Sequence, residues 1–267
     1  MIVLIPGASG GFGAVLGELL ASEGLTVYGT CRNPGAAAAD TPFTMLPMEI
    51  GNDESVAACV AEVLEREGRI DVVVNCVNEM MIGSVEEQTV EEVRALYDTN
   101  VFGVIQICKQ VIPAMRRQGA GTIVNMSSLG GIVAVPHMSA YTSAKFALEA
   151  FSEALYHEMK PHGIDVVIMQ PVAMRMDRPA LGSHLRTGAH VGENSSSHKM
   201  VARMAADTEA SGLTPEAVAE KIYQVITRRR KPLRVPMDRA RALSVVKRLA
   251  PQAVIDRLIA GLLRDVK

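Results

Sequence analysis

A tyrosine and a lysine four positions apart are the strongest sign of chemistry in the sequence. Tyr141 and Lys145 begin a segment with helical spacing of apolar residues, and residues four apart share one face of a helix. An ammonium stabilises a neighbouring phenolate, so we expect Lys145 to lower the pKa of Tyr141 and to permit proton exchange with a carbonyl or alcohol oxygen. The alternative is a packed tyrosine beside a lysine that extends its ammonium to solvent.

A glycine-rich turn directly follows the first apolar segment and opens a helical pattern. Residues 7–13 read GASGGFG. Glycines at such a turn let the backbone tighten and approach a pyrophosphate, whose charge the helix N-terminus favours. A turn that only packs a helix against a strand would use the same residues, so the motif gains its meaning from its place between strand and helix.

Two serines close the apolar segment at residues 122–126. Ser127 and Ser128 would stand at the carboxyl edge of a strand, where open α/β sheets bind their ligands. A serine hydroxyl in this place can hydrogen-bond a reacting oxygen. The alternative is a pair of serines that only forms a turn.

The elements that position these residues follow from the hydrophobic pattern. Short runs rich in β-branched residues alternate with longer helical patterns, and runs that are apolar on both faces predict parallel strands covered by helices on both sides. The sequence therefore predicts a single-domain α/β fold with a Rossmann-type, doubly wound parallel sheet of about seven strands. We expect strands at residues 2–5, 26–31, 44–48, 71–75, 122–126, 165–170 and 233–235, and helices at residues 12–22, 55–67, 90–117 and 139–159.

The composition is that of an ordinary globular protein. The chain has 267 residues, of which 48% are hydrophobic and 21% charged, and these values exclude a disordered or collagen-like chain. The four cysteines are far apart and lack metal-binding spacing, so we expect no metal, no disulfide and a reducing compartment. The short apolar start has no basic flank and does not fit a signal peptide, which makes the cytoplasm the expected location.

The C-terminal segment differs from the rest in charge. Residues 228–267 hold 12 basic and 3 acidic side chains, a net charge of +9, but no aromatic residue, so nucleic-acid binding is not expected. We interpret residues 1–236 as a dinucleotide-binding and catalytic domain, residues 174–213 as its mobile substrate lid and residues 237–267 as a basic amphipathic helical extension. The apolar stripe of this extension predicts packing on its own domain or on a neighbouring subunit, with contact to a membrane surface as the less favoured alternative.

Four motifs together resemble the short-chain dehydrogenase/reductase family over residues 1–236. The family's TGxxxGxG turn matches residues 6–13, with Pro6 where the family has threonine. The other matches are the YxxxK pair, the serine thirteen positions before its tyrosine and the asparagine of an N-x-x-G segment. They fall on Tyr141, Lys145, Ser128 and Asn100.

The resemblance implies a role for each of these four residues. Tyr141 is the general acid in carbonyl reduction and the general base in alcohol oxidation. Lys145 lowers the pKa of Tyr141 and binds the hydroxyls of the nicotinamide ribose. Ser128 orients the substrate oxygen, and Asn100 holds a water molecule in a proton relay through Lys145. Hydride comes from the cofactor, so no metal is needed.

The end of the second predicted strand bears on the choice of cofactor. NAD-binding relatives carry an acidic residue there that binds the ribose 2′-hydroxyl. This chain has Arg32, a guanidinium that binds a 2′-phosphate, and no carboxylate to repel it. We therefore expect NADP(H), with Arg32 as the phosphate anchor and Thr30 or Asn33 assisting. A plain surface arginine is the alternative.

The expected cofactor site takes in the glycine turn, the end of the second strand, an acidic-apolar pair beside the adenine and the ends of later strands. Its residues are Gly7, Ser9, Gly11, Phe12, Gly13, Arg32, Asn33, Glu49, Ile50, Asn75, Tyr141, Lys145 and Pro171. Two stretches depart from the family, because its usual NNAG reads NCVN at residues 75–78 and its usual proline-glycine reads PV at residues 171–172. The lost glycine in the first of them adds a side chain beside the adenine-ribose wall.

Apolar and flexible residues are expected to line the substrate cleft by analogy with the family. Such a pocket favours a hydrophobic ketone or secondary alcohol of steroid, retinoid, terpenoid or polyketide type. Residues 140–155 and 171–177 resemble hydroxysteroid and retinol dehydrogenases. A structural role for the histidine of this set is the alternative to substrate contact. The expected substrate residues are Met80, Met81, His137, Met138, Met174 and Met176.

A non-catalytic NADP-binding sensor of the same fold is the competing hypothesis. The altered loops at residues 75–78 and 171–172 favour it, whereas a pure binder has no need of a phenol and an amine one helical turn apart. The resemblance also implies a homodimer or homotetramer formed through the two long helices at residues 90–117 and 139–159.

Overall fold

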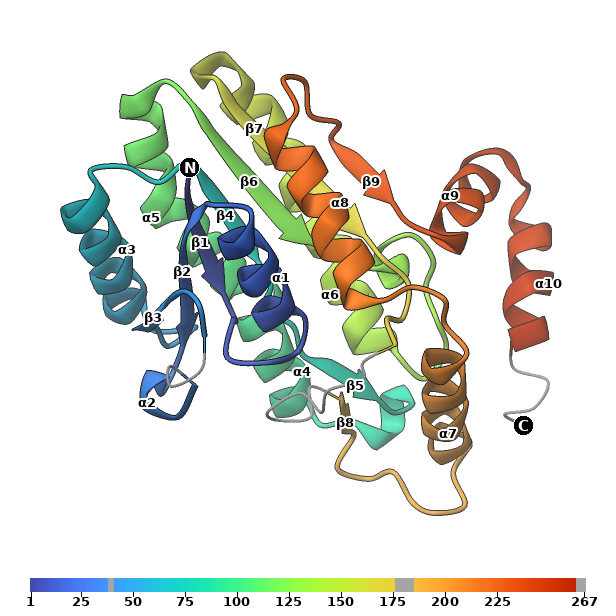
Figure 1. Ribbon diagram of the computed structural model, residues 1–267. Coiled ribbons are helices and arrows are strands. Elements are labelled where there is room, and N and C mark those ends of the chain that lie inside the picture. Colours follow the sequence, from blue (N-terminus) through green and yellow to red (C-terminus); the bar gives the residue numbers. More distant parts are fainter. Residues whose placement is uncertain (38–40, 176–184, 263–267) are drawn as a thin grey trace.

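A seven-stranded parallel sheet forms the centre of the protein (Figure 1). The computed structural model describes residues 1–37, 41–175 and 185–262. The strand order is β3-β2-β1-β4-β6-β7-β9, so the chain runs outward from β1 to β3, crosses to β4 and runs outward to β9. The strands are β1 (Ile2–Pro6), β2 (Thr26–Cys31), β3 (Thr44–Pro47), β4 (Val72–Asn75), β6 (Gly121–Met126), β7 (Ile164–Gln170) and β9 (Arg234–Pro236).

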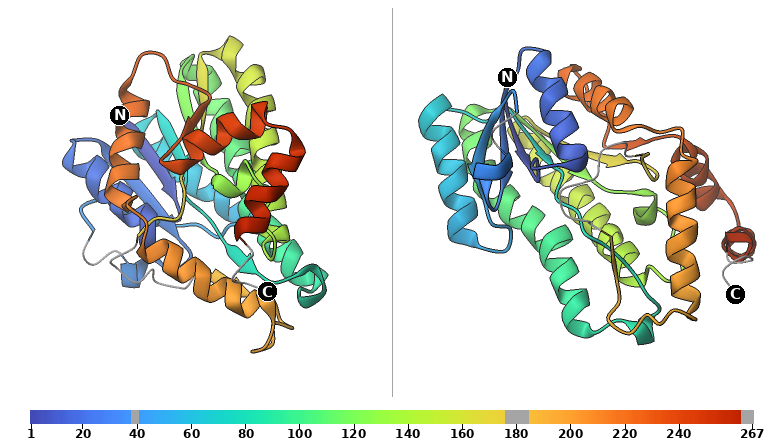
Figure 2. Two further views of the ribbon diagram at one scale, coloured as in Figure 1. Left: turned by 90° about the vertical axis from the view of Figure 1, so that its right-hand side faces the viewer. Right: turned by 60° about the horizontal axis from the view of Figure 1, so that its bottom comes forward.

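Helices cover both faces of this sheet (Figures 1 and 2). Leu16 of α1 and Ile222 of α8 belong to the core cluster on one face, and Val60 of α3, Ile107 of α5 and Leu148 of α6 belong to the cluster on the other. The helices are α1 (Gly11–Ser22), α2 (Pro34–Ala37), α3 (Asp53–Glu67), α4 (Val90–Tyr97), α5 (Gly103–Gln118), α6 (Ser139–Met159), α7 (Ser196–Glu209), α8 (Pro215–Thr227), α9 (Arg239–Leu249) and α10 (Gln252–Leu262). Short 3₁₀ turns lie at Val85–Glu87, Leu129–Gly131 and Lys160–His162.

The side chains of β1 show why the hydrophobic pattern predicts this fold. Val3 and Ile5 pack in the cluster under α1 and α8, whereas Ile2 and Leu4 pack in the cluster under α3, α5 and α6. Successive side chains of a strand point to opposite faces, so a strand between two helical layers needs an apolar residue at every position. The predicted doubly wound α/β fold is confirmed.

The long helix expected at residues 90–117 is interrupted. A five-residue π-helix, Asp98–Phe102, separates α4 from α5. Thr89 and Glu92 form a capping box at the start of α4, which agrees with a helix beginning at this point. Single π-turns of this kind occur often at functional sites, because the inserted residue changes the direction of nearby side chains.

The region expected to be a mobile lid contains a regular helix. α7 has 14 residues, and Ser195 caps it by accepting a hydrogen bond from the N–H of Ser197. Part of the region expected to be mobile is therefore a capped helix, which begins at Ser196. β5 (Met80–Ile82) and β8 (Leu185–Thr187), which the sequence does not predict, pair in a second, two-stranded parallel sheet. Residues 176–184 of the expected lid lie outside the described residues.

α9 and α10 follow β9 and project from the body of the molecule (Figures 1 and 2). Among the side chains described in these two helices, only Ala240 and Ile255 are buried. Val254 is 39% exposed and Leu258 47% exposed. Of the apolar stripe, Ile255 is therefore buried and these two residues are not, and its packing on the domain or on a neighbouring subunit stays a prediction. Residues 263–267 lie outside the described part.

Candidate active site

Tyr141 and Lys145 lie in the first two turns of α6, next to the carboxyl end of β6. Both side chains are buried, with exposed fractions of 6% and 1%. The Lys145 Nζ donates a 2.8 Å hydrogen bond to the backbone oxygen of Met126, the last residue of β6. It lies 5.8 Å from the centroid of the Tyr141 ring. The phenol and the amine are therefore brought together as their spacing predicts, and a lysine that extends to solvent is ruled out.

Ser128 stands just beyond β6 and faces the same phenol. Its hydroxyl accepts a 3.1 Å hydrogen bond from the Gly130 N–H. A Cβ on Gly130 would lie 3.1 Å from the ring of Tyr141, so glycine leaves room for the ring. The residue after Ser128 donates its N–H to the Pro171 oxygen at 2.9 Å, which ties this turn to the end of β7. The neighbouring Ser127 hydroxyl is buried and has no partner among the described residues.

Burial changes the proton affinity of both members of the pair. It raises the pKa of Tyr141, and the hydrogen bond with Ser128 opposes this change. It lowers the pKa of Lys145 to about 7, against the attraction of Glu149 and Cys76. The expected lowering of the Tyr141 pKa is thus not found in the chain by itself, because desolvation disfavours a phenolate and an ammonium alike.

Asn100 lies in the π-helix between α4 and α5 and is fully buried. Its side-chain amide bonds twice with the backbone of Glu79. The Oδ1 atom accepts from the Glu79 N–H at 2.8 Å, and the Nδ2 atom donates to the Glu79 oxygen at 2.7 Å. These bonds fix the amide next to the start of β5, and its role in holding a water molecule stays a prediction.

The glycine-rich turn between β1 and α1 fits a pyrophosphate. Gly7 and Gly11 have φ angles of 87° and 55°, in the left-handed region that favours glycine. A Cβ on Gly13 would lie 2.1 Å from the Gly7 oxygen, so glycine is needed for α1 to approach β1 this closely. No described side chain caps α1 and its first turn holds no acidic residue, which leaves backbone N–H groups to bind an anion. Ser9 and Phe12 are half-buried in this turn.

Arg32 follows β2 at the same edge of the sheet as the glycine turn. Both Arg32 and Asn33 are exposed. The Thr30 carbonyl accepts a 3.2 Å hydrogen bond from the Gly7 N–H, which joins the end of β2 to that turn. The Thr30 side chain is 1% exposed and donates to the Met48 sulfur at 3.6 Å. The prediction that the Thr30 hydroxyl assists Arg32 is therefore wrong, because this hydroxyl points into the core.

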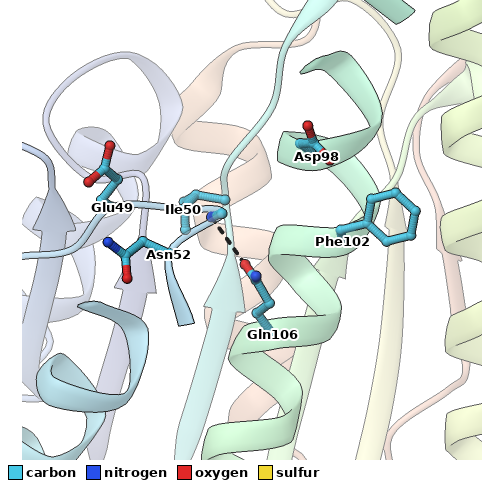
Figure 3. A pocket seen from close by; sticks show the side chains of 7 residues that line it. Glu49, Ile50, Asn52, Asp98, Phe102 and Gln106 are labelled. Atoms are coloured by element: carbon cyan, nitrogen blue, oxygen red, sulfur yellow. Dashed lines mark hydrogen bonds between the residues drawn. The ribbon is translucent and has the colours of Figure 1, made fainter. Parts of the chain in front are cut away.

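Glu49 and Ile50 follow β3 and line a cavity of about 430 Å³ (Figure 3). The Gly51 N–H donates a 3.1 Å hydrogen bond to the Gln106 Oε1, which ties this loop to α5. A Cβ on Gly103 would lie 2.1 Å from the Ile50 Cγ2. The glycine of the N-x-x-G segment thus makes room for the apolar residue expected beside the adenine. The other residues that line the cavity are Gly51, Asn52, Asp98, Phe102 and Gln106.

Asn75 at the end of β4 and Asn78 just beyond it differ in their hydrogen-bond partners. The Asn75 side chain is 1% exposed and donates to the Asn125 Oδ1 at 2.7 Å, and Asn125 donates in turn to the Ser152 Oγ. The Asn75 side chain therefore joins two strands inside the sheet, and the expected contact of this residue with the cofactor stays a prediction. The buried Asn78 Oδ1 has no partner within the described part of the chain. Such an acceptor at the carboxyl end of a strand fits a hydroxyl donor on a ligand.

Tyr141 belongs to an apolar cluster that is rich in methionine. Met81 and Met138 are buried in this cluster, at 3% and 4% exposed, so they support the site rather than line an open surface. Met80 is half-buried at the edge of the cluster. The expected methionine-rich surroundings of Tyr141 are therefore present, with Met80 as the predicted member that is accessible.

Two predicted substrate residues lie elsewhere, and two others were not predicted. Met174 packs against the core cluster under α1 and α8, and Met176 lies outside the described residues. Met200 and Met204 of α7 join the cluster around Tyr141. Their spacing of four, five residues after the capping Ser195, is a helical pattern from which they could have been predicted.

His137 ties α7 to the segment that leads into α6. Its Nδ1 lies 2.8 Å from the Ser197 Oγ, and Ser197 donates to Glu87. Hydrogen bonds from Ser195 and Ser197 lower the pKa of Glu87 to about 2, so this carboxylate stays charged. His137 has a φ angle of 62°, which is uncommon for a residue with a Cβ. The observed contacts give His137 a structural role, the alternative to substrate contact.

Neither a metal-binding cluster nor a membrane-spanning helix is found in the part of the chain that the structure describes. Over residues 1–37, 41–175 and 185–262, no three His, Cys, Asp or Glu side chains come together as metal ligands. None of the helices in these ranges combines the length and the apolar character needed to cross a membrane. The four cysteines are free thiols.

Known proteins share both the sequence pattern and the fold. The profile of the short chain dehydrogenase family matches residues 1–180. The chain belongs to this family. It is 30% identical over 264 residues to an uncharacterized oxidoreductase of Bacillus subtilis, with 92% of each chain covered. The protein is therefore an oxidoreductase of the short-chain dehydrogenase/reductase family.

Two further matches bear on the extent of the likeness. The chain is 40% identical over 170 residues to a 3-ketodihydrosphingosine reductase of Bacteroides thetaiotaomicron, a match that spans 64% of this chain and 62% of that protein. A solved short-chain dehydrogenase from Streptomyces avermitilis superposes with a TM-score of 0.81 at 31% identity, covering 98% of this chain and 94% of the other. The short-chain dehydrogenase/reductase fold therefore extends over nearly the whole chain.

Proposed function

We propose that the protein is an NADP(H)-dependent oxidoreductase that interconverts a hydrophobic ketone and a secondary alcohol. The observation that carries this proposal is the meeting of the buried Tyr141 and Lys145 with the half-buried Ser128 beside a methionine-rich cluster. A phenol, an amine and a hydroxyl that converge in one place match the needs of proton transfer to a carbonyl oxygen, whereas a binding protein does not need them.

Four side chains divide the work of proton transfer. Ser128 orients the substrate oxygen toward the Tyr141 phenol. Tyr141 donates its proton to that oxygen in reduction and accepts it in oxidation. Lys145, held by its hydrogen bond to the Met126 oxygen, stabilises the phenolate. Asn100 is the proposed holder of a water molecule that relays a proton to Lys145. Bound NADPH would supply the hydride.

The residues at the carboxyl edge of the sheet support NADP(H). The uncapped start of α1 suits a pyrophosphate, and the exposed Arg32 lies at the end of the adjacent strand. A guanidinium binds phosphate with two parallel hydrogen bonds, and β2 ends without a carboxylate that would repel it. Asn33 is the proposed partner of Arg32, and Glu49 with Ile50 is the proposed adenine contact.

Two observations support a hydrophobic substrate. Met80 and Met204 are partly buried at the edge of the cluster around Tyr141, where flexible thioether side chains can adapt to an apolar ligand. The relative from Bacteroides thetaiotaomicron is named for a keto substrate of sphingosine type. A long-chain ketone of this kind joins the steroid, retinoid, terpenoid and polyketide classes as a candidate. We propose α7, anchored through Ser197 and His137, as the lid over the substrate.

A homodimer or homotetramer formed through α5 and α6 belongs to the same proposal. Phe102, directly before α5, is 52% exposed, and Phe146 on α6 is 40% exposed. Exposed aromatic side chains are enriched where subunits meet. A cytoplasmic location stays a prediction.

Replacement of Tyr141 by phenylalanine tests the proposed function. NADPH oxidation is followed with a panel of lipophilic ketones, including a long-chain 3-keto amine. Tyr141→Phe should lower kcat/KM by roughly 10²–10⁴, because it removes the proton donor and keeps the ring in the cluster. NADPH binding and the melting temperature should stay close to those of the wild type.

Tyr156→Phe is the matched control, because Tyr156 lies on the same helix but outside the cluster around Tyr141. It should leave kcat/KM unchanged. Full activity in Tyr141→Phe contradicts the mechanism. A wild-type protein that binds NADPH and turns over none of the ketones is the outcome that favours the sensor hypothesis.

A further inference from the structure

A buried carboxylate lies on the same face of α6 as the proposed proton-transfer pair. Tyr141, Lys145 and Glu149 follow one another at four-residue steps, a spacing that aligns side chains along a helix. Glu149 is 7% exposed, and carboxylates are rarely buried to this extent unless they have partners. The proton-transfer steps described above leave Glu149 without a task.

Residues from two neighbouring strands hold Glu149 in place. Gln170 of β7 donates from its Nε2 to the Glu149 Oε1 at 2.9 Å. Arg234 of β9 binds the Oε2 atom through its Nε at 3.0 Å and reaches Glu153 with a second nitrogen at 2.8 Å. A Cβ on Gly131, in the turn after β6, would lie 3.3 Å from the Glu149 Oε1. The carboxylate is therefore fixed beneath the turn that carries the proposed substrate-orienting serine.

The charges around this network do not leave Glu149 fully neutralised. Arg234 divides one positive charge between two carboxylates, Glu149 and Glu153, and the further cationic groups, Arg248 and His157, act on Glu153. Lys145 is the buried cation one turn away on α6. Burial lowers the pKa of Lys145 to about 7, and its attraction to Glu149 opposes that lowering. Cys76, the other titratable group that acts on Lys145, has a thiol whose pKa is raised by burial, so it stays neutral near pH 7.

We propose that Glu149 is a positioning residue that keeps Lys145 in its ammonium form beside Tyr141. The inference rests on the proposed function, in which only a charged Lys145 stabilises the phenolate. Glu149 acts through Lys145 and contacts neither the substrate oxygen nor the phenol. Gln170 and Arg234 fix the direction of the carboxylate, and Arg234 limits the strength of its charge. This arrangement offsets the desolvation that works against an ammonium at this depth.

An NMR titration of the full-length protein with ¹³C-labelled lysine tests the proposal without reference to turnover. The Lys145 signal is assigned by its loss in Lys145→Arg. Glu149→Gln keeps the size of the side chain and removes its charge. We expect the Lys145 pKa to fall by about one unit, and the alkaline limb of kcat/KM for ketone reduction to move to lower pH by the same amount.

Two further variants give the opposite sign and a matched control. Arg234→Gln removes the cation that offsets Glu149, so the Lys145 pKa and the alkaline limb should both rise. Glu153→Gln removes a carboxylate of the same network that is 51% exposed, and water screens its charge, so both should move much less. Glu149→Asp keeps the charge and should bring both back toward the wild-type values.

Clear outcomes overturn or support the proposal. A Lys145 pKa that is the same in the wild type, Glu149→Gln and Arg234→Gln overturns it. Should Glu149→Gln fail to fold, the upward shift in Arg234→Gln decides, because this side chain is 35% exposed and its loss leaves Glu149 bound to Gln170. Absence of ketone reduction in the wild type overturns the proposed function alone, since the titration of Lys145 does not depend on turnover.

Discussion

The first strand and the last two helices both carry apolar side chains, but these side chains differ in burial. β1 is buried at every position, and its side chains alternate between two core clusters. In α9 the side chains of Val245 and Leu249 are 54% and 80% exposed. A pattern of apolar residues therefore predicts which face of an element is apolar, but it does not say what covers that face. Other elements of the chain bury the side chains of β1, whereas the described part of the chain buries few side chains of α9 and α10.

The largest effect is expected at the contact between α1 and β1. Gly13→Ala would place a Cβ 2.1 Å from the Gly7 oxygen, which is backbone and cannot move aside as a flexible side chain can. We expect a loss of about 3 kcal/mol or more in the free energy of unfolding, at the upper end of the usual cost of overpacking. Urea unfolding followed by circular dichroism measures this loss.

The matched control for this prediction comes from the second half of the chain. Gly212 lies before α8 with open space around it, so Gly212→Ala should change the stability by less than about 0.5 kcal/mol. An equal loss of unfolding free energy in the two variants would contradict this prediction, because it would mean that the close approach of α1 to β1 does not cause the loss in Gly13→Ala. NADPH affinity should fall in Gly13→Ala only, because this turn forms the proposed pyrophosphate site.

The same contrast explains how much of the fold the sequence could predict. β2 and α6 have the predicted bounds, Thr26–Cys31 and Ser139–Met159. Both elements pack against other parts of the chain, and their hydrophobic patterns each fit one type of secondary structure. β5 has three residues, too few for alternation to be read, and its partner β8 is distant in sequence. The π-helix at Asp98–Phe102 has no compositional sign, since it depends on how α4 and α5 pack.

The candidate site divides in the same way. Tyr141 and Lys145 could be found because their relation is local, one turn apart on one helix. Glu149 could not, because its burial depends on Arg234, 85 residues later in the sequence. Thr30 shows the opposite error, since its place at a strand end suggests a ligand contact whereas its hydroxyl faces the core. Sequence spacing thus predicts which residues meet on a single helix. Contacts between residues of different elements depend on how the strands of the sheet are arranged.

A smaller effect, on the choice of cofactor, is expected at Arg32. This residue directly follows the buried strand β2 but is itself exposed. Arg32→Ala should reduce the ratio of kcat/KM for NADPH over NADH by roughly ten- to a hundredfold, since a hydrogen-bonded charge pair is worth about 1.5–3 kcal/mol. Steady-state kinetics with each cofactor measures the ratio. The free energy of unfolding of Arg32→Ala should stay at the wild-type value.

Arg94→Ala is the control for Arg32, because Arg94 is also on the surface, with a side chain that is 71% exposed and paired with Glu91. It should leave the cofactor ratio unchanged. A ratio that Arg32→Ala does not alter would assign this residue to the plain surface and remove the main support for NADP(H).

The smallest effect is expected at the end of the chain, where Leu249→Ala should alter the free energy of unfolding by less than about 0.5 kcal/mol. Leu148→Ala is the matched reference, because Leu148 is 1% exposed and such truncations cost about 2–5 kcal/mol. A large loss at Leu249 that depends on protein concentration would show that a neighbouring subunit covers α9, since association stabilises by mass action. Sedimentation of the wild type with anionic but not neutral vesicles would instead assign the exposed stripe and its basic neighbours to a membrane surface. The contribution of a leucine to the free energy of unfolding therefore depends on what buries its side chain. Leu148 and Leu249 differ in this respect, and the hydrophobic pattern of the sequence does not show the difference.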